Sequence, residues 1–221
     1  MVDKETQQNK SSVTAVLFDW SGTISDDRRP VYEANKKMCD YWGVPAVESF
    51  EEWANGASMT PVGFFRDRGV TASGDEIYEV YRRCFKEVLN EGGFPTLIPG
   101  TLETLQRLSQ ANIALGIVSS HPQIYLEPEA REYGLFPLMK ILHGDAQNKI
   151  SAIMTVCQMM GLDRSRTIYI GDTIYDIRSA REAGLITAGV STGYHTHEAL
   201  QAEKPDHLFT RLSQVLTLVQ V

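Results

Sequence analysis

The sequence predicts an α/β protein with a doubly wound, Rossmann-like parallel sheet as its core and an inserted all-helical cap domain. Two observations lead to this prediction. After residue 95, short apolar runs alternate with segments of helical periodicity, which is typical of parallel strands joined by right-handed crossovers. Before that point, residues 26–95 read as helices with no strand among them.

Six apolar runs are predicted as the strands of the core. They are Val13–Asp19, Ile113–Ser120, Met139–Asp145, Thr167–Asp172, Leu185–Ser191 and Asp206–Phe209. Apolar residues at helical spacing predict three helices between them: Thr101–Asn112, Asn148–Gly161 and Tyr175–Gly184. The last two end in a glycine, a common helix stop signal.

The region 26–95 is predicted to be a helical cap. Its helices are expected at Pro30–Gly43, Ser49–Ala57, Thr60–Gly69 and Gly74–Gly93. The chain leaves the sheet just after Asp19, at the carboxyl edge where open α/β sheets bind ligands, so we expect the cap above the strand ends. Residues 13–25 and 96–221 then form the core, and the polar residues 1–12 form a flexible tail.

Composition and charge limit the classes of partner. The formal net charge of −7 argues against nucleic acid and acidic membranes, which favour a basic surface. The polar N-terminus lacks a signal-peptide core, and no apolar run reaches membrane-spanning length. The three cysteines lack metal-ligand spacing and suit reduced thiols. We therefore expect a cytoplasmic protein that acts on a small molecule; its oligomeric state stays open.

Residues able to bind phosphate or a cation follow the predicted strand ends or open the next helix. They are Asp19, Ser119, Ser120, His121, Lys149, Asp172 and Asp176. Because the carboxyl ends of parallel strands meet at one edge of a sheet, we expect these side chains to form one site.

The chemistry of such a site can be argued from the residue types. A carboxylate such as Asp19 can attack phosphorus and form an aspartyl-phosphate. Mg²⁺ prefers carboxylate oxygens, so Asp19 and Asp172 can share it. Lys149, the Ser119 hydroxyl and the backbone amides of the Gly22 turn would complete a phosphate cradle.

Four segments resemble the haloacid dehalogenase superfamily of hydrolases, in the order that this family uses. They are "FDWSGT", "IVSS", Lys149 and "GDTIYD", and the resemblance covers nearly all of the chain from about Val13. The helical insertion after the first segment is similar to the cap of the phosphoglycolate phosphatase and β-phosphoglucomutase branches. The "DWSGT" opening, with its tryptophan, also resembles phosphonoacetaldehyde hydrolases.

The resemblance implies a role for each matching residue. Asp19 would be the nucleophile, Ser119 a phosphate ligand and Lys149 the residue that steadies both, with Gly22 and Ser120 beside the phosphate.

The resemblance also implies a Mg²⁺ site. Asp19, Asp172 and the main-chain carbonyl of Ser21 would bind the ion, and Asp176 would either bind it or anchor Lys149. The implied function is a Mg²⁺-dependent phosphatase of a small phosphorylated metabolite, with an aspartyl-phosphate intermediate at Asp19.

Ser21 departs from the family pattern. Phosphatases of the family usually carry a second aspartate at this position as general acid and base, and a serine hydroxyl performs neither task well near neutral pH. His121 is the nearest substitute acid in chain order; His143, Asp145, His195 and His197 are others.

Three other functional interpretations of the sequence stay open. A phosphonoacetaldehyde hydrolase would need a cap lysine, but no lysine lies between Lys37 and Lys86. A dehalogenase would not need the acidic pair of "GDTIYD". A non-catalytic phospholigand-binding or scaffold protein would not need Asp19, Lys149 and Asp172 together.

Overall fold

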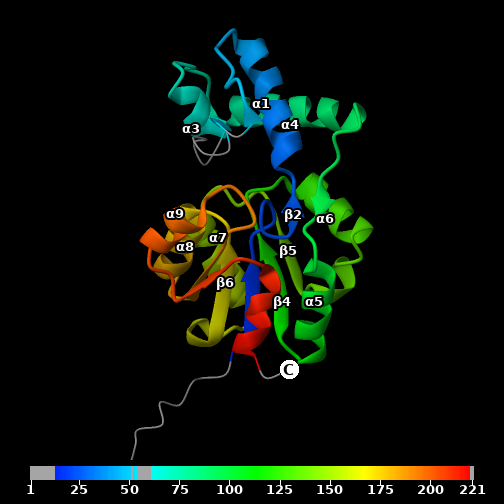
Figure 1. Ribbon diagram of the computed structural model, residues 1–221, viewed down its shortest axis with the longest axis vertical. Helices are drawn as coiled ribbons and strands as arrows, with labels where there is room; N and C mark the ends of the chain where they lie inside the picture. Colours follow the sequence, from blue (N-terminus) through cyan, green and yellow to red (C-terminus); the bar gives the residue numbers. More distant parts are fainter. Residues whose placement is uncertain (1–12, 51, 54–60, 220–221) are drawn as a thin grey trace, which may run out of the picture.

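The computed structural model describes residues 13–50, 52–53 and 61–219 (Figure 1). The predicted tail 1–12 lies outside the described residues, as does most of the predicted helix Ser49–Ala57.

The core is a six-stranded sheet in which every neighbouring pair is parallel, in the order β5-β4-β1-β6-β7-β8. The strands are β1 (Ala15–Phe18), β4 (Ala114–Val118), β5 (Ile141–His143), β6 (Thr167–Gly171), β7 (Ile186–Val190) and β8 (His207–Phe209). The predicted α/β fold is confirmed, and each predicted strand contains one of these. β1 lies between β4 and β6, so the first strand is central.

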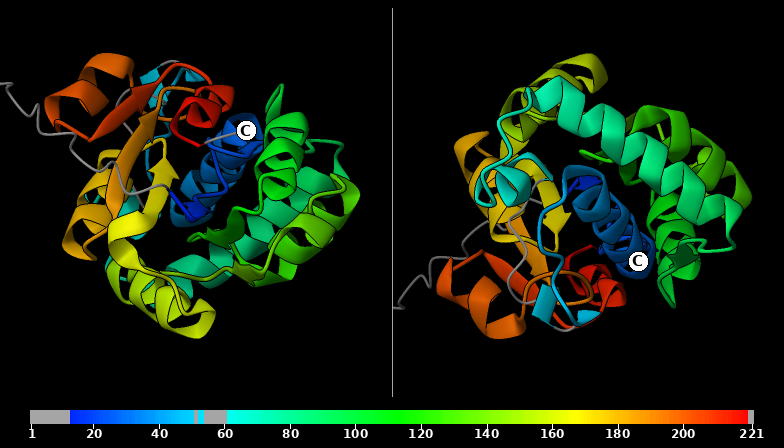
Figure 2. Two further views of the ribbon diagram at one scale, coloured as in Figure 1. Left: turned by 90° about the horizontal axis from the view of Figure 1, so that it is seen from below. Right: turned by 90° about the horizontal axis from the view of Figure 1, so that it is seen from above.

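Helices cover both faces of the sheet, as the view from below shows (Figure 2, left). One face carries α5 (Thr101–Gln110), α6 (Gln123–Glu132) and the C-terminal 3₁₀ turns Leu212–Leu218; the other carries α7 (Lys149–Met160) and α8 (Ile174–Glu182). The short helix α9 (His197–Ala202) follows β7. Periodicity did not predict α6, which holds a proline, Pro128, in its interior.

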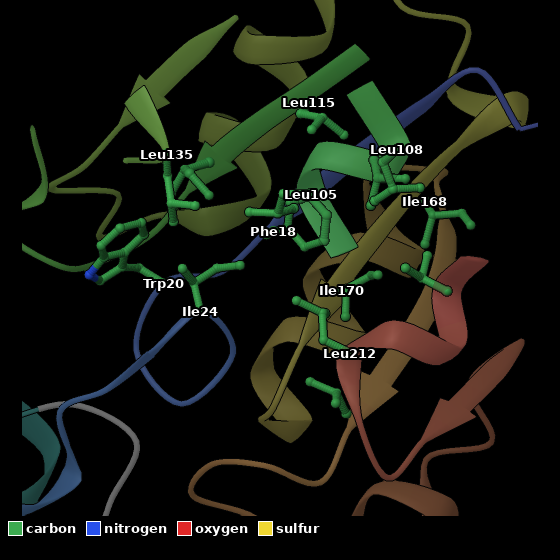
Figure 3. Packing of buried hydrophobic residues seen from close by; sticks show 14 of the residues in the cluster. Phe18, Trp20, Ile24, Leu105, Leu108, Leu115, Leu135, Ile168, Ile170 and Leu212 are labelled. Atoms are coloured by element: carbon green, nitrogen blue, oxygen red, sulfur yellow. The ribbon is translucent and has the colours of Figure 1, made fainter. Parts of the chain in front are cut away.

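Alternation along β1 divides its side chains between the two faces. Phe18 joins a cluster with Leu105 of α5 and Ile170 of β6 (Figure 3), whereas Leu17 packs with α7 and α8 on the opposite face. All four residues of β1 are fully buried, which explains why the sequence of this strand is a continuous apolar run.

A helical insert lies above the carboxyl ends of the strands (Figure 1). It contains α1 (Arg28–Trp42), α3 (Pro61–Arg66) and α4 (Gly74–Asn90), and these helices share a separate apolar cluster that includes Met38, Phe65 and Phe85. The cluster gives the insert its own core, as expected for a cap.

Two short strands correct the expectation that the region from Asp26 to Thr96 holds no strand. β2 (Ser25–Asp26) and β3 (Thr96–Leu97) pair antiparallel and join the two connections between core and insert. Each has only two residues, too few to show an alternating pattern. They lie at the predicted borders between cap and core; the exact division into 26–95 and the rest stays a prediction.

Candidate active site

Three strand ends bring their polar residues together, as the strand order requires. Asp19 follows β1, Ser119 follows β4 and Asp172 follows β6, and β4 and β6 are the two neighbours of β1. All three side chains are buried. The buried strands β1 and β6 therefore end in carboxylates because these residues lie at the edge of the sheet, beneath the insert.

Lys149 links the two acidic parts of the site. It opens α7 and lies buried, with Nζ 2.6 Å from Asp176 Oδ1 and 3.2 Å from Asp19 Oδ1. Burial alone would lower the pKa of Lys149, but the charges of Asp176 and Asp19 raise it above its ordinary value. Lys149 therefore stays positively charged at neutral pH.

The Asp176 carboxylate is held in place by hydrogen bonds from its neighbours. Its Oδ1 accepts hydrogen bonds from Lys149 Nζ and the Tyr169 hydroxyl, and its Oδ2 accepts from the backbone amide and hydroxyl of Thr173. The same Thr173 hydroxyl caps α8, so Asp176 is fixed at the first turn of the helix.

Glycines make room for the carboxylates. A Cβ on Gly22 would lie 2.3 Å from Asp172 Oδ2, and one on Gly193 would lie 2.0 Å from the same atom. Gly22 also has a φ of +74°, which glycine adopts readily. The backbone therefore approaches Asp172 from two loops, and Tyr194 donates its backbone amide to Oδ2 at 2.7 Å.

The acidic cluster fits a divalent cation. Asp19, Asp172 and Asp176 each present a carboxylate oxygen within 4.8 Å of the others. Asp19 Oδ1 has no hydrogen-bond partner in the described part of the chain, and its nearest charged neighbour is Lys149 Nζ at 3.2 Å. Burial and the neighbouring carboxylates raise the pKa of Asp172, and burial raises that of Asp19 despite Lys149. Oxygen-only donors of this kind suit Mg²⁺.

The Ser21 side chain is hydrogen-bonded to the carboxylate of Asp27, which the sequence does not indicate as a site residue. Its hydroxyl donates to Asp27 Oδ2 at 2.5 Å, and the Tyr194 hydroxyl donates to Asp27 Oδ1 at 3.1 Å. Asp27 is fully buried, and this burial raises its pKa to about 6. Asp27 lies in the linker to the insert, where no periodicity marks a buried residue.

His121 adjoins the same carboxylate. Its Nε2 contacts Glu129 Oε1 at 3.2 Å, and its Nδ1 lies 3.9 Å from Asp27 Oδ2. Glu129 in turn accepts a hydrogen bond from the Trp20 indole at 2.7 Å. Burial lowers the pKa of His121, but the Glu129 hydrogen bond and the charges of Glu129, Asp27 and Asp19 outweigh it and raise the pKa above its ordinary value.

The other candidate acids are placed less favourably. His143 and Asp145 do not line the cavity at the site, and neither does His197. His195 does line it, but its Nδ1 accepts the Ile174 amide and burial lowers its pKa, so it is neutral.

A cavity of about 140 Å³ connects the cluster to the insert. Asp19, Ser21, Ser120, His121 and Lys149 line it from the core, and aromatic side chains line it from the helices above. The structure thus brings the predicted catalytic residues to one cavity, with Ser119 and Asp172 buried beside it.

No helix in the described part of the chain is long and apolar enough to cross a lipid bilayer.

Curated relatives of the chain include phosphoglycolate phosphatases. The enzyme of Vibrio parahaemolyticus is 25% identical over 98% of this chain and 99% of its own length. The Escherichia coli enzyme is 29% identical over 62% of this chain and 56% of its own.

Solved structures share the fold at lower identity. A haloacid dehalogenase-like family protein from Streptococcus pneumoniae superposes with a TM-score of 0.78 and 22% identity, covering 94% of this chain and 99% of that one. CbbY from Rhodobacter sphaeroides, solved in complex with phosphate, has a TM-score of 0.75 and 18% identity, covering 95% and 100%. The family model of haloacid dehalogenase-like hydrolases matches residues 16–190, and the chain belongs to this family.

Proposed function

We propose that the protein is a Mg²⁺-dependent phosphatase of a small phosphorylated metabolite that works through an aspartyl-phosphate at Asp19. The observation that carries the proposal is the placement of Asp19 at the cavity, in contact with buried Lys149 and within 4.8 Å of the other two carboxylates of the cluster. The names of the phosphoglycolate phosphatase relatives support the same class of reaction.

Asp19 and Asp172 would hold the ion together with the main-chain carbonyl of Ser21. Asp176 already accepts four donors, so we assign it to anchoring Lys149 instead of to binding the metal. When bound, Mg²⁺ neutralises charge on the phosphoryl group. Lys149 contributes a fixed positive charge on the other side of Asp19.

The first half-reaction forms a bond between an Asp19 carboxylate oxygen and phosphorus, and the bond from phosphorus to the ester oxygen breaks. Lys149, the Ser119 hydroxyl and the backbone amides near Gly22 and Ser120 orient the phosphoryl group. The departing oxygen needs a proton unless it leaves as a stable anion. In the second half-reaction water attacks phosphorus, its proton goes to the group that protonated the leaving oxygen, the bond between phosphorus and the Asp19 oxygen breaks, and phosphate is released.

We assign His121 as the group that gives a proton to the departing oxygen. His121 lines the cavity. Asp27 does not line it, but Ser21, which donates a hydrogen bond to Asp27, does. The Nδ1 of His121 has only the 3.9 Å contact with Asp27, too long for a hydrogen bond, so a proton there is available to a leaving-group oxygen. Asp27 and Glu129 keep the ring charged, and the Ser21 hydroxyl is held by Asp27.

The alternatives receive less support. Lys149 is the only lysine among the described residues that line the cavity, and its pairing with Asp19 and Asp176 leaves none for a Schiff base. Asp172 is buried and forms no salt bridge among the described residues, a costly arrangement that neither a metal-independent dehalogenase nor a scaffold requires.

Phosphate release tests the proposal. Wild-type protein, Asp19→Asn and His121→Gln are assayed with Mg²⁺ and with EDTA on alkyl phosphates and on 4-nitrophenyl phosphate. We expect Mg²⁺-dependent release that Asp19→Asn abolishes. Loss of the acid should lower kcat for alkyl phosphates by about 10²–10⁴ in His121→Gln and far less for the aryl ester, whose leaving group needs no proton.

The pH profile separates a proton donor from a structural histidine. Because the pKa of His121 is raised, its charged form persists to higher pH, and kcat/KM for alkyl phosphates should fall as the pH rises through that raised value. Equal losses in His121→Gln for both kinds of ester, or a wild-type profile without this alkaline limb, would refute the assignment.

A further inference from the structure

We infer that the insert side of the cavity binds an uncharged, hydroxylated leaving group, such as a sugar or polyol, and disfavours a leaving group that carries a carboxylate. The inference rests on the proposed phosphatase function and adds the substrate class to it. Two unpaired polar atoms and the charge of the cavity lead to it.

Two side chains of the insert that line the cavity each carry a buried polar atom that has no partner in the described part of the chain. Trp53 is 3% exposed and its indole Nε1 makes no hydrogen bond; Asn35 is 5% exposed and its Oδ1 makes none. The side-chain amide nitrogen of Asn35 already has a partner, because it donates to the Val31 carbonyl at 3.1 Å. Buried polar groups normally have partners, so the two atoms are explained if a ligand supplies them.

The two free atoms have complementary character. The Trp53 indole N–H donates and the Asn35 carbonyl oxygen accepts. A hydroxyl group can satisfy either one, because it both donates and accepts. A carboxylate can satisfy only the donor and would place negative charge against the Asn35 oxygen.

The Trp53 ring is held in place by other aromatic rings. Its centroid lies 5.6 Å from that of Tyr32, 6.1 Å from Phe50 and 5.7 Å from Tyr194. Phe64 and Tyr81 also line the cavity from the insert. This part of the cavity offers ring faces and two hydrogen-bonding atoms, which suits the mixed apolar and hydroxylated surface of a sugar or polyol.

No positive charge that lacks a carboxylate partner faces this space from the described residues. Lys149 is paired with Asp19 and Asp176, and His195 is neutral. His121 is charged, but the carboxylates of Glu129 and Asp27 lie 3.2 Å and 3.9 Å from its two ring nitrogens and balance its charge. The sequence holds no lysine or arginine between Lys37 and Arg66, so that part of the insert supplies none.

The arginines near the insert are placed elsewhere. Arg28 pairs with Asp26 at 2.8 Å, and Arg68 donates to the Phe64 carbonyl at 3.1 Å. Arg29 and Arg66 are exposed, and none of these four arginines lines the cavity; Arg82 and Arg83 of α4 do not line it either. A second anionic group on the substrate would therefore meet several buried carboxylates and no cation that lacks a carboxylate partner.

The test measures binding without turnover. Asp19→Asn protein with Mg²⁺ is titrated in a calorimeter with ribose 5-phosphate, 2-phosphoglycolate and inorganic phosphate. The same titrations use the double variants Asp19→Asn/Trp53→Phe and Asp19→Asn/Trp42→Phe. Trp42 is the matched control, because it lies in the insert and packs on Phe65 and Tyr41 but does not line the cavity.

We expect ribose 5-phosphate to bind at least about tenfold more tightly than 2-phosphoglycolate, because the latter brings an unmatched charge. Trp53→Phe keeps the ring and removes the N–H, so the ratio of the Kd for ribose 5-phosphate to that for inorganic phosphate should rise about five- to tenfold. Trp42→Phe should leave this ratio unchanged.

Equal or tighter binding of 2-phosphoglycolate overturns the inference, and so does a Kd ratio that Trp53→Phe does not move. Circular dichroism confirms that each variant is folded. The preference of the Asp19→Asn protein between the two esters tests the charge argument without any change at Trp53. Failure of the proposed function is seen separately, as the absence of Asp19-dependent phosphate release from an activated substrate such as acetyl phosphate, an acyl phosphate.

Discussion

The buried carboxyl of Asp27 should make the stability of the protein fall with rising pH. Burial raises its pKa from 3.8 to about 6, so the folded state holds this proton at pH values where the unfolded chain has lost it. Folding is therefore penalised progressively as the pH rises from about 4 to about 6, and the penalty persists above that. Two pKa units correspond to about 3 kcal/mol.

Asp27→Asn removes the titration while preserving the partners. The Asn Oδ1 can accept from the Ser21 hydroxyl, and Nδ2 can donate to the Tyr194 hydroxyl, the two groups that Asp27 bonds now. Relative to wild type, the free energy of unfolding of Asp27→Asn should rise by up to about 3 kcal/mol between pH 4 and pH 7. Urea unfolding in EDTA at several pH values measures this difference.

Asp26→Asn is the control with the opposite sign. Asp26 is half-exposed, and its Arg28 partner lowers its pKa, so its contribution is present above the ordinary pKa and is lost as the pH falls. Its removal should cost a little stability at neutral pH. If the wild-type and Asp27→Asn curves run parallel from pH 4 to pH 7, burial does not penalise the Asp27 anion and the reasoning is wrong.

Two further substitutions test the core of the site. Lys149→Met should lower the free energy of unfolding at pH 7 by about 3–5 kcal/mol, because it leaves Asp19 and its neighbours without their buried positively charged partner. Lys140 is exposed, so Lys140→Met should change this free energy little. Urea unfolding compares the two variants. Gly22→Ala should abolish the rise in Tm on adding Mg²⁺, because its Cβ would displace Asp172. Gly43→Ala has a similar φ of +61° but open space, so it should lose some stability and keep the Mg²⁺ response; an equal response in both would refute the role of Gly22.

The sequence was sufficient for the fold and for the centre of the site because both depend on strand order. Asp19, Ser119 and Asp172 each follow an apolar run, and the rule that parallel strands end at one edge brings them together. Lys149 follows from its place at the start of a helix. None of these placements needs knowledge of side-chain packing.

The contacts between insert and core needed the structure. Asp27 and Glu129 approach His121 from a linker and from α6, and no spacing in the sequence joins these residues. Nothing in the sequence distinguishes Trp53 from a packing residue, and only the structure shows that it lines the cavity and that its indole nitrogen has no partner among the described residues. Such contacts depend on how two separate clusters of side chains meet, which periodicity does not describe.

Reductive trapping shows whether an aspartyl-phosphate forms at Asp19. Protein turning over an activated phosphate ester with Mg²⁺ is treated with borohydride, which reduces an acyl phosphate to an alcohol, and the peptides are identified by mass spectrometry. We expect that Asp19 is converted to homoserine only when substrate and Mg²⁺ are both present, and that no other carboxylate of the cluster is changed. Turnover that continues without this modification, or that survives in Asp19→Asn, would contradict it.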